Sequence, residues 1–94
     1  SMPSLSRDTQ RKYDIIRAID HMDRPSLQDI SEATGIPAGT VKRQLTSIRE
    51  EFKVKILFIR DPSSPEGAMG YYALEGWGIL DPNSFRVHFG DSTS

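Results

Sequence analysis

The chain has 94 residues and no cysteine, is 36% hydrophobic and 27% charged, and carries a formal net charge of −1. These values fit one small soluble globular domain and exclude a disulfide framework or a thiolate metal site. No apolar run approaches the roughly 18 residues of a membrane span and no signal-peptide pattern is present, so we expect a cytoplasmic protein.

We expect the first helix over about residues 7–22, with Ser6 as its cap and a break ahead of Pro25, because proline disfavours helical conformation in the residue before it. Residues 1–5 are expected to be flexible. Lys12 is expected on the outer face of this helix. The aliphatic residues that recur at helical spacing, and that predict its inner face, are Ile15, Ile16, Ile19 and Met22.

Residues 26–45 carry the signals of two helices joined by a tight turn. Ser26 can cap the first of these helices, over about residues 27–34, and Asp29 completes an acidic variant of the capping box. Gly35 follows at the position where that helix must stop and where the chain needs a positive φ, which costs glycine little. No other segment of the sequence predicts a structural motif as specifically.

The next helix is predicted over about residues 38–52, after Pro37, which presets φ and lacks the N–H group that a helix start leaves unpaired. Apolar residues follow at intervals of four, three and four along it, which predicts a single buried stripe. These residues are Val41, Leu45, Ile48 and Phe52.

Beyond Phe52 the hydrophobic period changes from about 3.6 to about 2, which favours strands. We therefore predict a long hairpin over about residues 53–80, in which Tyr72 and Leu74 share one face. Its loop is residues 61–70, a segment with two prolines and two glycines.

Residues 85–89 again alternate apolar and polar side chains, which predicts a short C-terminal strand or extended arm. A helix that begins at Asp81 is the alternative, and residues 91–94 are expected to be flexible. The alternation places three apolar side chains on one face: Phe85, Val87 and Phe89.

Together these elements predict an α+β fold that is mainly α. It is a winged helix, in which a three-helix bundle with a helix-turn-helix is followed by a β-hairpin wing and a short C-terminal strand or arm. Residues 1–94 are expected to form a single domain of this kind.

The helix-turn-helix resembles the one in the amino-terminal domain of IclR-type bacterial transcriptional regulators. The resemblance covers roughly residues 10–60, and Ser31 departs from it at a position where such motifs usually carry alanine. The matching residues are Ile30, Glu32, Ala33, Gly35, Ile36, Pro37, Thr40, Val41, Arg43 and Leu45.

The resemblance implies a transcriptional regulator that binds double-stranded DNA through the second helix of the motif. We expect this binding to be sequence-tolerant to moderately sequence-specific. Ala38 and Gly39 cannot form side-chain hydrogen bonds to a base, so Arg43 is expected to make the main base contact. The residues expected to contact DNA are Pro37, Ala38, Gly39, Thr40, Lys42, Arg43, Gln44 and Thr46.

The wing is expected to contribute less, because Glu66 in its tip, residues 63–67, and Asp61 beside the tip would repel phosphate. The residues that remain as possible wing or backbone contacts are Arg60, Ser63 and Ser64.

The negative net charge favours an alternative, a winged helix that binds proteins and no longer reads DNA. A hairpin with two apolar faces needs a second cover, which is either the arm of residues 85–89 folding back or a second copy of the chain. We expect a homodimer through the hairpin or the C-terminal arm, since two-fold symmetry would present two recognition helices to a palindromic site. We expect no enzymatic activity, no cofactor and no metal, because His21 and His88 stand far apart in sequence and belong to no metal-spaced cluster.

Overall fold

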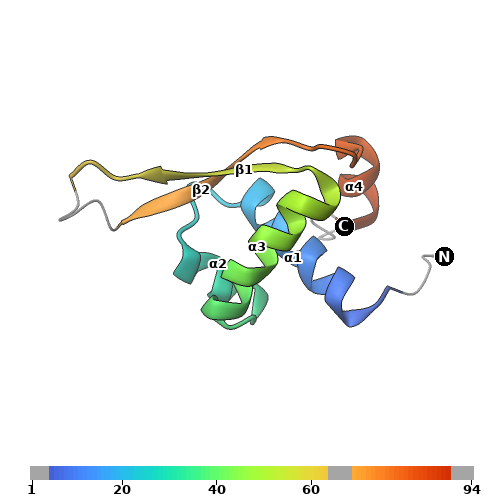
Figure 1. Ribbon diagram of the computed structural model, residues 1–94, viewed down its shortest axis with the longest axis horizontal. Helices are drawn as coiled ribbons and strands as arrows, with labels where there is room; N and C mark the ends of the chain where they lie inside the picture. The colour runs from blue at the N-terminus through green and yellow to red at the C-terminus, as the bar shows by residue number, and fades with distance from the viewer. Residues whose placement is uncertain (1–4, 64–68, 90–94) are drawn as a thin grey trace.

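A computed structural model describes residues 5–63 and 69–89 of the chain (Figure 1). The expected flexible ends, residues 1–5 and 91–94, lie outside the described residues except for Leu5. In chain order the elements are α1 (Arg7–His21), α2 (Leu27–Thr34), α3 (Ala38–Phe52), β1 (Lys55–Arg60), β2 (Gly70–Gly76) and α4 (Pro82–Phe89).

The first helix begins at the predicted cap, where the Ser6 hydroxyl accepts a hydrogen bond of 3.1 Å from the Thr9 amide. Ile15, Ile16 and Ile19 are buried as expected, because they share the face that α1 turns toward the core. The expectation that Lys12 lies on the outer face is wrong. Its side chain is only 5% exposed, since it lies between α1 and α3.

The helix-turn-helix has the local geometry that its sequence predicts. The Ser26 hydroxyl and the Asp29 carboxylate each accept a 3.0 Å hydrogen bond from the other residue's backbone amide, which is a complete capping box. Gly35 ends α2 in the left-handed region at φ 74°. Pro37 occupies the cap position of α3, one residue before its first helical residue.

The core is one continuous cluster between the three N-terminal helices and the inner face of the hairpin. The predicted stripe on α3, from Val41 to Phe52, lies at its centre, and Ile30 and Ile36 close it at the helix-turn-helix corner. Burial of this apolar area is the main favourable term in folding a domain of this size.

The hairpin is antiparallel and pairs Ile56 with Leu74 and Phe58 with Tyr72. Tyr72 and Leu74 do share one face, as predicted, and it packs on the helices. A hydrogen bond of 2.8 Å from the Tyr72 amide to the Pro25 carbonyl ties β2 to the start of α2. In Figure 1 the hairpin extends along one side of the helices, with α4 at the end opposite its loop.

The base of the hairpin is joined to the end of α3. Lys53 leaves α3 in the left-handed region at φ 60°, and the Ile79 amide donates a 2.8 Å hydrogen bond to the Phe52 carbonyl. Gly78, also left-handed at φ 56°, packs directly on the Phe52 carbonyl and the Lys53 backbone. A side chain at residue 78 would collide with this backbone.

The C-terminal segment corrects one expectation, because residues 85–89 form part of α4 and not a strand or arm. The Asp81 carboxylate accepts a 3.0 Å hydrogen bond from the Ser84 amide and so begins the helix. Phe85 and Phe89, four residues apart, both pack on the Tyr13 ring, whereas Val87 is 79% exposed. The alternating sequence is therefore compatible with a helix, because its inner face carries the two phenylalanines and Val87 faces solvent.

Helix α4 is held against α1 by a second contact. The Arg86 guanidinium donates two hydrogen bonds, of 3.0 and 2.9 Å, to the Asp20 carboxylate, and it lies over the Trp77 ring. Asp20 thereby raises the pKa of Arg86.

With a C-terminal helix in place of the expected strand or arm, the predicted mainly helical α+β winged helix is confirmed. No helix among the described residues is long and apolar enough to cross a bilayer.

Replacing Gly78 by alanine is expected to destabilise the fold by at least about 1–2 kcal/mol, because the left-handed backbone alone costs an L-residue that much. The clash with the Phe52 carbonyl adds to the penalty. Chemical denaturation of the variant measures the change in the free energy of unfolding. The matched control is Gly76→Ala, whose new methyl group would lie 3.4 Å from the Lys55 Cβ. Equal stability of the two variants would contradict the proposed constraint.

Candidate nucleic-acid interface

The outer face of α3 carries most of the residues that the sequence analysis selected. Lys42, Arg43 and Thr46 are exposed on one side of the helix, and Pro37 and Gly39 are exposed at its start. Ala38 and Thr40 are half-buried. A short helix with two adjacent cations on its free side has the dimensions and charge to lie in the DNA major groove.

The Arg43 side chain is oriented by its neighbours on α3. Its guanidinium donates a 3.0 Å hydrogen bond to the Thr40 hydroxyl, one turn earlier. A Cβ atom at Gly39 would lie 3.7 Å from the same guanidinium. The side chain therefore runs back along the helix toward its N-terminus, over the space that glycine leaves open.

Gln44 does not lie on this face, so its inclusion among the predicted DNA contacts is corrected. Its side chain is 9% exposed, and its amide nitrogen donates a 2.8 Å hydrogen bond to the Asp8 carboxylate. Gln44 thus connects α3 to the start of α1 and is turned away from the outer face.

Gln44 belongs to a polar cluster that fixes α3 on α1, and sequence reasoning missed this cluster. The buried Lys12 ammonium lies 2.8 Å from the Asp8 carboxylate and 3.0 Å from that of Glu51. Hydrogen bonds from Lys12 and Gln44 lower the pKa of Asp8, and those to Asp8 and Glu51 raise the pKa of Lys12. The i, i+4 spacing of Asp8 and Lys12 was a signal that could have found it.

A second interaction fixes α3 from the hairpin side. The Arg49 Nε donates a 3.1 Å hydrogen bond to the carbonyl of Ile56 in β1. The outer face of α3 thus belongs to a helix that is held at its back by α1 and along its second half by the hairpin.

The predicted wing contacts are only partly described. Ser63 turns back on Asp61, whose carboxylate accepts hydrogen bonds of 2.9 and 2.7 Å from the Ser63 amide and hydroxyl. These bonds lower the pKa of Asp61, so the carboxylate stays charged. Arg60 is exposed at the end of β1, and Ser64 lies outside the described residues.

The comparisons with known proteins bear on the helical part of the chain. Residues 9–51 match the family model of the IclR helix-turn-helix domain. The resemblance seen in the sequence is thereby confirmed for this segment, which spans α2 and nearly all of α1 and α3. No curated protein and no solved structure matches the chain. Within the described part of the chain, no group of three metal-binding side chains is found.

Protonation of Asp8 is expected to weaken the Lys12 cluster. Because the folded pKa of Asp8 is lowered, its contribution to stability is present above about pH 4, the pKa range of an unfolded aspartate, and is lost as the pH falls through the lower folded value. The contribution of Lys12, whose pKa is raised, is lost only in alkali. We expect Asp8→Asn to flatten the acid limb of a plot of unfolding free energy against pH.

Urea denaturation followed by circular dichroism, at a series of pH values, measures this slope. Asp23→Asn removes an exposed carboxylate outside the cluster and serves as the charge control. If Asp8→Asn and the wild type lose stability in parallel as the pH falls, the cluster does not carry the proposed linkage.

Proposed function

We propose that the protein regulates transcription by binding double-stranded DNA through α3, and that this binding is sequence-tolerant to moderately sequence-specific. The observation that carries the proposal is the exposure of Lys42 and Arg43 on the free side of a helix that is anchored behind by Lys12 and Gln44. The match of residues 9–51 to the IclR helix-turn-helix domain supports it.

In this proposal α3 enters the major groove and Arg43 reads guanine through its O6 and N7 acceptors. The hydrogen bond to Thr40 holds the guanidinium before binding, so less side-chain freedom is lost on contact. Lys42 and Thr46 contact the phosphate backbone, and the absence of a side chain at Gly39 leaves room for the Arg43 guanidinium at the start of the helix. Direct readout rests on Arg43, which limits specificity.

A homodimer is part of the proposal, because two-fold symmetry presents two α3 helices to successive major grooves. The most exposed large apolar side chains in the described chain are Val87 on α4, at 79%, and Ile79, at 70%. Val87 belongs to α4 and Ile79 to the segment that joins the hairpin to α4, which favours the C-terminal helix and its junction as the surface between subunits.

The alternative function is a winged helix that binds protein partners. The net charge of −1 and the charged carboxylate of Asp61 near the wing tip favour it, since both reduce attraction to phosphate. Salt dependence separates the two functions. A DNA-binding protein loses affinity for mixed-sequence duplex steeply as salt rises, whereas a protein-binding module retains no duplex even at low salt.

Arg43→Ala is expected to lower the affinity for a selected duplex by about 1–3 kcal/mol, because a bidentate contact to guanine is lost. Fluorescence anisotropy with a labelled duplex, selected from a random pool, measures the change. Arg17→Ala removes the same charge from the exposed face of α1 and is the matched control. Equal affinity of the wild type and Arg43→Ala for selected and random duplexes would contradict a role in readout.

Light scattering coupled to size exclusion is expected to give twice the mass of the monomer. Val87→Glu should shift the protein toward the monomer, because it places a charge in an apolar contact, without changing the circular dichroism spectrum. A wild-type protein that stays monomeric at all concentrations tested would rule out the dimer.

A further inference from the structure

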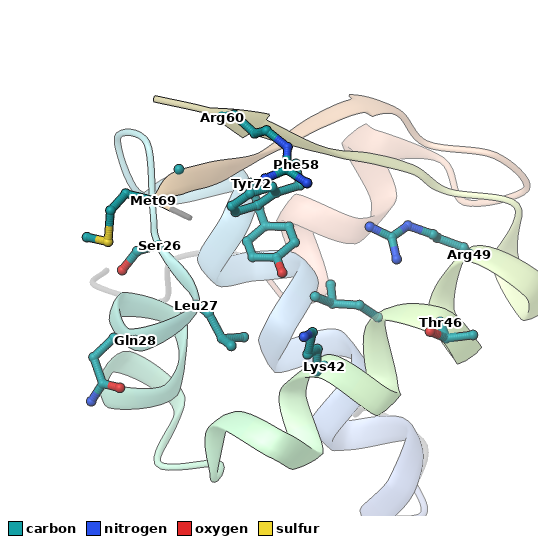
Figure 2. Close-up of a pocket in the computed structure, with 12 residues that line it drawn as sticks. Ser26, Leu27, Gln28, Lys42, Thr46, Arg49, Phe58, Arg60, Met69 and Tyr72 are labelled. Atoms are coloured by element: carbon teal, nitrogen blue, oxygen red, sulfur yellow. The ribbon is translucent and has the colours of Figure 1, made fainter. Parts of the chain in front are cut away.

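A groove of about 630 Å³ lies between α3 and the hairpin, beside the proposed DNA-binding face. The start of α2, the outer side of α3 and both strands line it (Figure 2). Its volume is in the range of sites for small molecules. The hydrogen bonds from Arg49 to Ile56 and from Tyr72 to Pro25 fix its walls, so the groove exists without a ligand.

The floor of the groove is apolar. Leu27 and Phe58 supply open apolar surface, whereas Leu45 and Tyr72, 1% and 8% exposed, lie beneath it. The Phe58 and Tyr72 rings pack with centroids 5.0 Å apart. Phe58 remains 39% exposed, although it belongs to the face of the hairpin that packs on the helices. Apolar surface left open inside a concave site is a common mark of ligand binding.

The rim of the groove is cationic. Lys42 and Arg49 approach it from α3 and Arg60 from β1, and none of the described residues that line it is acidic. In Figure 2 the Arg49 guanidinium and the Tyr72 hydroxyl both project into the space between α3 and the hairpin. The site therefore attracts a negative charge and can donate hydrogen bonds to it.

We propose that this groove binds a small aromatic or aliphatic carboxylate whose apolar body covers Phe58 and Leu27 and whose carboxylate lies near Lys42 and Arg49. A DNA phosphate supplies the charge but leaves the apolar floor uncovered, whereas an apolar acid satisfies both parts of the site. Lys42 and Thr46 belong both to this lining and to the proposed DNA-binding face. A bound carboxylate therefore excludes DNA, and this second part rests on the proposed function.

The test uses 2-naphthoate as the probe and 2-naphthalenemethanol as its neutral counterpart. Titration followed by protein NMR is expected to shift the resonances of Leu45, Phe58 and Tyr72 with naphthoate and much less with the alcohol. Phe58→Ser should weaken naphthoate binding by about tenfold, through the lost apolar contact. Leu57→Ser is the matched control, since Leu57 is 41% exposed on the opposite face of the same strand, and it should bind naphthoate as the wild type does.

Competition is measured with a labelled duplex, from which naphthoate and not the alcohol should displace the protein. Phe58→Ser should retain duplex binding and lose sensitivity to naphthoate, and circular dichroism checks that it folds. Naphthoate that binds equally well to both serine variants, or no better than the alcohol, overturns the site. Binding without displacement overturns the exclusion of DNA. A protein that binds naphthoate as expected but no duplex supports the site and contradicts only the proposed function.

Discussion

The buried ammonium of Lys12 is the interaction on which the presentation of α3 depends. It bridges the carboxylates of Asp8 and Glu51, and Gln44 adds a hydrogen bond to the same Asp8. Only the ammonium is buried, whereas the Asp8 and Glu51 side chains are 62% and 50% exposed, so removal of both carboxylates would leave a buried charge without a partner, which is strongly destabilising. The cluster therefore fixes which side of α3 faces α1, and through this it fixes that Lys42 and Arg43 face outward.

Local signals made the helix-turn-helix predictable from the sequence. The Ser26–Asp29 capping box, the left-handed Gly35 and the apolar stripe of α3 are decided by residues within a few positions of one another, and the structure has all three. The hairpin was predictable for the same reason, because its strands alternate and its inner face is buried.

What the sequence could not give depends on contacts between distant segments. Lys12 and Gln44 are polar, so their positions on a helix pattern suggest solvent, and only the approach of α1 to α3 buries them together. Residues 85–89 alternate like a strand, but the packing of Phe85 and Phe89 on Tyr13 favours a helix. In both cases tertiary packing overrides the local pattern. The groove was not predictable either, since its lining comes from four elements.

The joint between α3 and the hairpin has a mechanical consequence. Gly78 packs on the last turn of α3, and the Ile79 amide donates a hydrogen bond to the Phe52 carbonyl, so the base of the hairpin is joined directly to the end of α3. The hairpin is also hydrogen-bonded to the second half of α3 through Arg49 and to the start of α2 through Tyr72. A change in its direction would therefore disturb the packing at the end of α3, so we expect the hairpin and α3 to keep one relative orientation.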